Sequence, residues 1–216
     1  MKAVIFDLDG TLLDTIDDIA DSMNAVLEKH GLPLHITQEY KQFVGDGATN
    51  LVTRAVAGAE LEDDKLPLLE NEYKSEYLKR QVDKTMPYEG IPELLSALTE
   101  RGVMVAVLSN KPHIATLEVI THFFPDISFS ALIGHRQGHP VKPDPAGVIE
   151  ILEILELTHD EVVYVGDTWT DMQTATAAGL IAIGALWGFR DKKELEENGA
   201  TILAGHPLDI LNLFGG

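Results

Sequence analysis

Two carboxylates near the start of the chain, Asp7 and Asp9, are well suited to chemistry by type and spacing. They follow a short, uninterrupted apolar run from Ala3 to Phe6, which predicts a β-strand buried on both faces. Ligand sites in open α/β sheets lie at the carboxyl ends of such strands. Two carboxylates about 4 Å apart repel each other by roughly 4 kcal/mol at an effective dielectric constant near 20. The pair therefore predicts a bound cation or a shared proton at this point.

Other predicted strands also end in polar residues, which would meet the two aspartates at one edge of a parallel sheet. These residues are a hydroxyl and an amide, a single ammonium and two more carboxylates: Ser109 and Asn110; Lys142; Asp167 and Asp171. Hard divalent cations prefer oxygen ligands, so a cluster of four carboxylates predicts Mg²⁺. With Mg²⁺ and Lys142 the carboxylates still exceed the cations by one charge. Protonation of Asp9 would remove this excess and let a phosphate dianion approach.

The order of the predicted elements indicates the fold. Apolar runs predict six strands, at residues 3–6, 103–108, 131–133, 162–165, 181–186 and 200–204. From about residue 90 onward these strands alternate with helices, as they do in parallel βαβ units. Residues 15–86 instead show helical periodicity and no convincing strand. We therefore expect an α/β fold with a doubly wound (Rossmann-like) parallel sheet, formed by residues 1–14 and 87–216, and an inserted small helical cap domain, residues 15–86.

Composition restricts the expected partners and compartment. The 216 residues carry a formal net charge of −19, which opposes binding to nucleic acids and to anionic membrane surfaces. No apolar stretch approaches the roughly 18 residues of a membrane span, and the N-terminus has no features of a signal peptide. Cysteine is absent, which excludes disulfides and suits a reducing compartment. We expect a cytoplasmic monomer or homodimer with no nucleic-acid or membrane partner.

The motifs at the strand ends together resemble those of the haloacid dehalogenase-like phosphohydrolases. They stand in the order of that family: Asp-Leu-Asp-Gly-Thr-Leu at 7–12, Ser-Asn at 109–110, Lys-Pro at 142–143 and Gly-Asp-Thr-Trp-Thr-Asp at 166–171. Each motif alone is weak, but all four in order form a specific pattern. Val-Gly-Asp-Gly-Ala at 44–48 followed by Leu-Val-Thr-Arg-Ala at 51–55 is similar to the phosphoglycolate phosphatase branch. The inserted helices resemble the small cap of the same superfamily.

The resemblance implies a Mg²⁺-dependent phosphatase that acts on a small anionic phosphorylated metabolite, similar to 2-phosphoglycolate, through an aspartyl-phosphate. Asp7 would be the nucleophile, and Asp9 would protonate the leaving group and later deprotonate the hydrolytic water. Asp7, Asp167 and the backbone carbonyl of Asp9 would bind Mg²⁺. Asp171 would bind it directly or hold one of its ligands in place.

The resemblance also implies substrate contacts from both parts of the chain. Ser109 and Lys142 would hold the phosphoryl oxygens during transfer. The other expected substrate-binding residues are Gly10, Thr11 and Asn110 in the core, and Gly45, Asp46, Gly47 and Arg54 in the cap. Arg54 either reaches the substrate or pairs with neighbouring acids. The resemblance to phosphoglycolate phosphatases implies an asparagine in this loop where the present chain has Asp46. The negative charge of Asp46 would weaken the binding of a second carboxylate.

Two other functions fit parts of the pattern. A sugar-phosphate mutase of the same fold would also form the aspartyl-phosphate, but it would return the phosphoryl group to the substrate. A regulatory module without enzymatic activity would accept a phosphoryl group on Asp7 to switch a partner protein. Such a module needs neither a large insert nor a second acid at Asp9.

Overall fold

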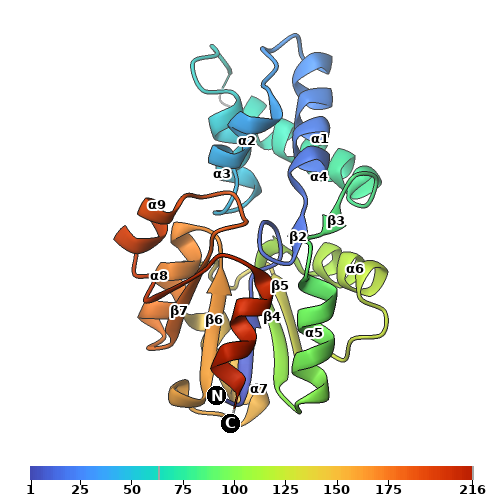
Figure 1. Ribbon diagram of the computed structural model, residues 1–216. Helices are drawn as coiled ribbons and strands as arrows, with labels where there is room; N and C mark the ends of the chain where they lie inside the picture. The colour runs from blue at the N-terminus through green and yellow to red at the C-terminus, as the bar shows by residue number, and fades with distance from the viewer. Residues whose placement is uncertain (63, 216) are drawn as a thin grey trace. The chain divides into compact units, whose positions relative to one another are not determined.

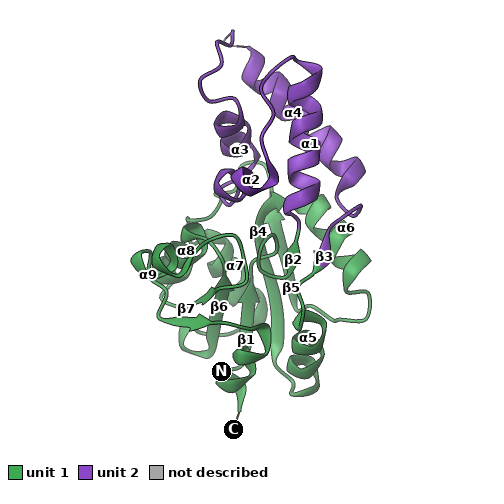
Figure 2. Cartoon of the chain, turned by 45° about the horizontal axis from the view of Figure 1, so that its top comes forward, with its two compact units in different colours: residues 1–14, 87–216 green, residues 15–86 purple. Residues whose placement is uncertain are grey.

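The computed structural model describes residues 1–62 and 64–215, and the chain divides into two compact units (Figure 2). Residues 1–14 and 87–216 form one unit, here called the core unit, and residues 15–86 form the other, here called the helical unit. Each unit contains fully buried apolar side chains of its own. In the ranges that the structure describes, no helix combines the length and apolar character needed to cross a bilayer.

A six-stranded parallel sheet organises the core unit (Figure 1). Its strands are β1 (Ala3–Phe6), β4 (Met104–Pro112), β5 (Ala131–His135), β6 (Val162–Gly166), β7 (Ile181–Ala185) and β8 (Ile202–Ala204). They lie in the order β5-β4-β1-β6-β7-β8, and all neighbours are parallel. The chain builds outward from β1 to β5 and then returns to β6 on the other side of β1, so the winding reverses between β1 and β6. Ligands bind at such switch points in open α/β sheets. The predicted doubly wound parallel sheet is confirmed.

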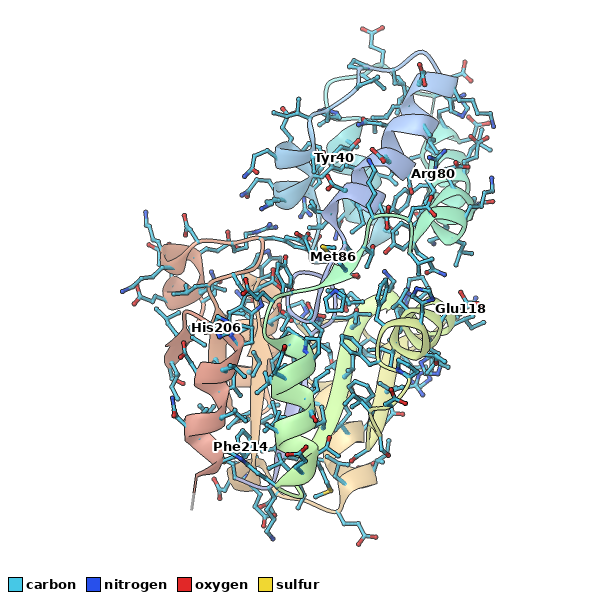
Figure 3. The ribbon with its side chains drawn as sticks, turned by 45° about the vertical axis from the view of Figure 1, so that its right-hand side comes forward. Tyr40, Arg80, Met86, Glu118, His206 and Phe214 are labelled. Atoms are coloured by element: carbon cyan, nitrogen blue, oxygen red, sulfur yellow. The ribbon has the colours of Figure 1, made fainter. Side chains whose placement is uncertain are left out.

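Helices cover both faces of this sheet (Figure 1). Those of the core unit are α5 (Ile91–Glu100), α6 (His113–Phe123), α7 (Ala146–Leu155), η1 (His159–Glu161), α8 (Trp169–Ala177), α9 (Lys192–Glu197) and η2 (Pro207–Phe214). Because side chains alternate along a strand, Val4 and Phe6 join one apolar cluster with α5, α6 and η2. Ala3 and Ile5 join the opposite cluster with α7, α8 and α9. Phe214, labelled in Figure 3, packs against the first of these clusters.

β4 continues four residues beyond its predicted end at Leu108 and carries polar residues into the sheet edge. Its register with β5 shifts between Leu108 and Pro112. Gly134 of β5 permits this extension, since a Cβ atom there would lie 2.7 Å from the carbonyl oxygen of Lys111 and 2.6 Å from Cα of His113. The sequence predicted that the strand ends at Leu108, because polar residues and proline usually end a strand.

The helical unit contains α1 (Ile16–Lys29), α2 (Thr37–Phe43), α3 (Ala48–Ala55) and α4 (Lys65–Arg80). The chain passes from one unit to the other next to two short paired strands, β2 (Leu13–Asp14) and β3 (Met86–Pro87). Tyr40, labelled in Figure 3, is fully buried, and its hydroxyl donates a hydrogen bond to Oδ1 of Asn24 at 2.8 Å. This contact fixes α2 against α1 inside the helical unit.

Asp18 ties the two ends of the helical unit together. Its side chain is buried in the first turn of α1. The carboxylate accepts hydrogen bonds from the backbone N–H groups of Lys84 (3.0 Å) and Thr85 (2.8 Å) and from Oγ1 of Thr85 (2.7 Å). A buried carboxylate is tolerated only with such partners, so these bonds hold residues 84–85 next to α1.

We expect Asp18→Ala to lower the free energy of unfolding by about 3 kcal/mol, because it leaves the buried N–H and hydroxyl of Thr85, and the partly buried N–H of Lys84, without their acceptor. Urea unfolding followed by circular dichroism measures this change. Asp17→Ala is the matched control, since Asp17 also lies in the first turn of α1 but is exposed. Its expected cost is below about 1 kcal/mol. Equal losses in the two variants would contradict the anchoring role of Asp18.

Candidate active site

Asp7 lies immediately after β1, at the switch point of the sheet. Its backbone N–H donates to the carbonyl of Val165 at 2.9 Å, which places it next to the end of β6. Oδ1 of its buried side chain accepts from the N–H of Leu8 at 2.7 Å and lies 2.7 Å from Nζ of Lys142. Burial and the charge of Asp171 raise the pKa of Asp7 well above its ordinary value, although Lys142 acts to lower it.

Lys142 bridges Asp7 and Asp171. Its Nζ atom lies 2.7 Å from Oδ1 of each carboxylate, and all three side chains are buried. Burial acts to lower the pKa of Lys142, but Asp171 and Asp7 more than offset it, so the net pKa lies well above the ordinary value. The side-chain amide of Asn110 makes two hydrogen bonds to the backbone of Lys142. Nδ2 of Asn110 donates to the carbonyl of Lys142 at 3.1 Å, and the N–H of Lys142 donates to Oδ1 of Asn110 at 2.8 Å. The lysine is therefore held through both its backbone and its ammonium group.

Both carboxylate oxygens of Asp171 already have protein partners. Oδ1 accepts from Lys142 and from the hydroxyl of Tyr164 at 3.2 Å. Oδ2 accepts from the N–H (3.0 Å) and Oγ1 (2.7 Å) of Thr168, the residue that precedes α8. These contacts indicate a role beyond the two metal-related ones expected for Asp171, namely orientation of Lys142, and its part in Mg²⁺ binding stays a prediction.

Asp167 is held at the end of β6 by contacts from two other loops. Its Oδ1 accepts from Oγ1 of Thr11 at 2.8 Å, and its Oδ2 accepts from the N–H of Phe189 at 2.8 Å. Cβ atoms at Gly10 or Gly188 would collide with its side chain, so both loops approach closely only because glycine stands there. Gly10 also has a φ of +90°, which favours glycine. Burial, followed by the charge of Asp171, raises the pKa of Asp167 to about 7.

Asp9 pairs with a lysine that the sequence analysis missed. Nζ of Lys111 lies 3.0 Å from Oδ1 of Asp9. The lysine side chain is 3% exposed and that of Asp9 is 22% exposed, so the aspartate keeps part of its carboxyl group accessible. The N–H of Lys111 donates to Oγ of Ser109 at 3.2 Å. The expectation of a single ammonium was wrong because the unforeseen extension of β4 brings Lys111 into the site.

The donor set of this edge fits a hard divalent cation. Oxygen atoms of Asp7, Asp167 and Asp171 lie within 4.8 Å of one another. With Asp9, the four predicted carboxylates face two ammonium groups, those of Lys111 and Lys142. If all are ionised, two negative charges remain, which one divalent cation would neutralise. Oxygen-only ligands favour Mg²⁺ over softer metals.

Comparison with known proteins identifies the family. A family model described as haloacid dehalogenase-like hydrolase matches residues 4–185. The chain belongs to the haloacid dehalogenase-like hydrolase family. It is 31% identical to a phosphoglycolate phosphatase of Chromobacterium violaceum over 198 residues, and this alignment covers 90% of the present chain and 89% of the relative. It is 28% identical over 214 residues to an N-acetylmuramic acid 6-phosphate phosphatase of Pseudomonas aeruginosa, with coverage of 99% and 94%.

Solved structures agree with this assignment. A structure from Haemophilus somnus, described as a predicted phosphoglycolate phosphatase, aligns with a TM-score of 0.92 at 28% identity and covers 100% of this chain and 98% of its own. The predicted resemblance to haloacid dehalogenase-like hydrolases is thus confirmed. The predicted enzyme class, a hydrolase acting on phosphoric monoesters, is confirmed with it.

The structure gathers the predicted core residues of this hydrolase at one sheet edge. Contacts within the core unit join the residues that follow β1 to those that follow β6, and tie the loop of Lys142 to β4. Thr11 contacts Asp167, and its carbonyl accepts a hydrogen bond from Nε1 of Trp187 at 2.9 Å. Sequence reasoning missed Thr168 and Tyr164 as partners of Asp171, since neither residue type signals such a contact.

Four predicted substrate-binding residues lie instead in the helical unit: Gly45, Asp46, Gly47 and Arg54. The Arg54 guanidinium makes two hydrogen bonds of 2.5 Å to the carboxylate of Asp46 and donates to the carbonyl of Phe43 at 2.8 Å. These bonds raise the pKa of Arg54. Of the two alternatives for Arg54, the structure shows the pairing with a neighbouring acid. Contact of these four residues with substrate stays a prediction.

We expect Asp167→Asn to stabilise the metal-free protein at high pH. The folded protein holds the Asp167 proton up to about pH 7, whereas the unfolded chain releases it near pH 4, so stability falls as pH rises between these values and stays low above them. The Asn variant lacks this loss and should gain about 4 kcal/mol at pH 8 relative to its difference from wild type at pH 4, because three pKa units at about 1.4 kcal/mol each separate the two states.

Urea unfolding in a chelator at the two pH values measures the change. Asp160→Asn is the matched control, because the Asp160 side chain is 84% exposed and should give no such gain. If the difference in the free energy of unfolding between wild type and Asp167→Asn is the same at pH 8 as at pH 4, the raised pKa of Asp167 is contradicted.

Proposed function

We propose that this haloacid dehalogenase-like hydrolase is a Mg²⁺-dependent phosphatase that hydrolyses small phosphomonoesters through an aspartyl-phosphate on Asp7. One observation carries the proposal: the buried Asp7 carboxylate is held by Lys142 beside Asp167 and Asp171, and oxygen atoms of the three aspartates lie within 4.8 Å of one another, close enough to hold one divalent cation. Such a cluster stabilises nothing by itself, since buried like charges oppose folding, and it suits a site that receives a cation and a phosphoryl group.

The first half of the reaction transfers the phosphoryl group. An oxygen of Asp7 attacks phosphorus as the bond to the leaving oxygen breaks. Asp9 gives its proton to that leaving oxygen, and its partly exposed carboxyl group leaves room for this contact. In the second half, Asp9 takes a proton from a water molecule that attacks phosphorus, and the bond to Asp7 breaks to release inorganic phosphate. Each residue then returns to its starting state.

The remaining residues bind and orient the phosphoryl group. Asp7, Asp167 and the backbone carbonyl of Asp9 would hold Mg²⁺, which would neutralise charge on the phosphoryl oxygens. Lys142, fixed by Asp171, would donate hydrogen bonds to these oxygens, as would the hydroxyl of Ser109. Both side chains are buried, so little water competes with them.

The proposed substrate is a small anionic metabolite similar to 2-phosphoglycolate. Relatives named phosphoglycolate phosphatase support it, although a relative of similar identity is named for N-acetylmuramic acid 6-phosphate. We propose that the helical unit acts as a cap that excludes water during turnover, with hinges near residues 13–15 and 86–90. The expected cytoplasmic location and the monomeric or homodimeric state stay predictions.

We expect release of inorganic phosphate from p-nitrophenyl phosphate with Mg²⁺, and loss of release with a chelator. Asp7→Asn removes the nucleophile and should lower kcat by at least about 10³-fold. Asp160→Asn is the control, since the Asp160 side chain is 84% exposed and lies outside the proposed set of residues. Release without any bisphosphate activator would favour a phosphatase over a mutase. An unaltered rate in the Asp7→Asn variant would refute the proposed nucleophile.

We expect Asp46→Asn to free Arg54 and to raise kcat/KM for 2-phosphoglycolate by about 10-fold relative to p-nitrophenyl phosphate, because a guanidinium then becomes available for the second carboxylate. A screen of phosphorylated metabolites with both proteins measures this. Arg54→Gln combined with Asp46→Asn should cancel the gain. If 2-phosphoglycolate is no better than the aryl phosphate in either form, the narrow substrate assignment is lost and the phosphatase remains.

A further inference from the structure

Lys111 is a buried lysine to which the proposed reaction gives no part. Its side chain is 3% exposed, and its Nζ atom lies 3.0 Å from Oδ1 of Asp9. Taking an ammonium group out of water is costly, and the attraction of a paired carboxylate often fails to repay that cost. The Asp9 side chain is 22% exposed, so water can solvate it without a buried partner. The pair is therefore a poor device for stability, which directs attention to its effect on Asp9.

The backbone of Lys111 is fixed by contacts that do not involve its ammonium group. Its N–H donates to Oγ of Ser109 at 3.2 Å, and its carbonyl accepts from Oγ1 of Thr116 at 3.3 Å. β4, which carries Lys111, lies beside β5, which carries Gly134 (Figure 1). A Cβ atom at Gly134 would lie 2.7 Å from the same carbonyl. The lysine is thus anchored independently of the aspartate that it contacts, as a group that positions another must be.

The contact with Lys111 makes the two oxygen atoms of the Asp9 carboxyl group different. An ammonium group has only donors, so the oxygen that faces it must accept a hydrogen bond. This oxygen is Oδ1. When Asp9 carries a proton, that proton is therefore on Oδ2. Because the side chain is partly exposed, Oδ2 is the oxygen left to meet a leaving group.

We propose that Lys111 is a positioning residue that fixes the carboxyl group of Asp9 with Oδ2 toward the leaving oxygen. The inference rests on the proposed function, which makes Asp9 the acid and base of the reaction. In the first half, Oδ2 gives its proton to the leaving oxygen as the bond from that oxygen to phosphorus breaks. In the second half, the same Oδ2 takes a proton from the attacking water. Lys111 transfers no proton and contacts no reacting atom.

The test compares phenyl phosphate with p-nitrophenyl phosphate, which have the same charge and nearly the same shape. Phenolate is the poorer leaving group and needs a proton from Asp9, whereas p-nitrophenolate leaves readily without one. Lys111→Met removes the ammonium group and keeps a side chain of similar length. We expect it to lower kcat/KM by about 10- to 100-fold for phenyl phosphate and by less than about 3-fold for p-nitrophenyl phosphate.

Two further variants guard this comparison. Lys193→Met is the matched control, because the Lys193 side chain is 80% exposed in the core unit, and it should change neither value. Lys111→Gln keeps a polar group in the buried position, but its amide is uncharged and one bond nearer the backbone. It should show the same selective loss as Lys111→Met. Equal losses for the two esters in both Lys111 variants would indicate general damage to the site and overturn the inference.

A double variant tests whether Lys111 acts through Asp9. Asp9→Asn alone should cause a selective loss for phenyl phosphate at least as large as that of Lys111→Met. Adding Lys111→Met to Asp9→Asn should then cost less than about a further 2-fold, since the lysine has no acid left to position. Losses that multiply in the double variant would show that Lys111 acts independently of Asp9, and would overturn the inference.

Crystal structures of the metal-free wild type and the two Lys111 variants give a readout without turnover. We expect one conformation of the Asp9 side chain in the wild type, and a displaced or divided side chain in the variants. An unchanged Asp9 would overturn the inference. If the wild type hydrolyses neither ester, the proposed phosphatase is refuted, and the crystal structures still decide whether Lys111 fixes Asp9. If both esters are hydrolysed and the Lys111 variants lose no selectivity, the positioning role is refuted and the phosphatase stands.

Discussion

The structure of the site depends on one buried ammonium placed between two buried carboxylates. Lys142 neutralises part of the charge of Asp7 and Asp171, whose removal from water would otherwise cost several kcal/mol per ion. The surrounding protein is arranged to keep this contact in place. Thr168 and Tyr164 hold Asp171. As a result the carboxylate of Asp7, the proposed nucleophile, has one defined orientation, in a site whose carboxylate oxygens favour a divalent cation.

Buried charges of the site and exposed charges of the surface act on a bound anion over different distances. The protein carries a formal net charge of −19, yet the site holds two buried ammonium groups, Lys111 and Lys142. At physiological ionic strength, exposed charges beyond about 8 Å are largely screened, whereas buried charges are screened much less. An anionic substrate therefore responds chiefly to the few groups that line the site. The acidic surface is therefore compatible with the binding of an anionic substrate, because solvent ions screen the surface charges but hardly screen the buried ones.

The sequence allowed most of the fold and the principal site residues to be predicted. Buried parallel strands appear as uninterrupted apolar runs, and the bounds of β1 were predicted to the residue. The aspartates that end β1 and β6 could be placed together because parallel strands share one carboxyl edge. Lys111 could not be placed, since its position depends on a register shift that Gly134 permits in a neighbouring strand. The pairing of Arg54 with Asp46 is likewise a choice between partners that only three-dimensional packing decides.

Because Asn110 binds the backbone of Lys142, the path of this loop does not depend on which side chain the residue carries. The amide binds the backbone N–H and carbonyl of that residue, a pair of groups that every amino acid except proline possesses. The path of the loop is consequently specified without reference to the ammonium group at its tip. Evolution of this scaffold could thus exchange the side chain, and with it the chemistry, while the main chain keeps its course.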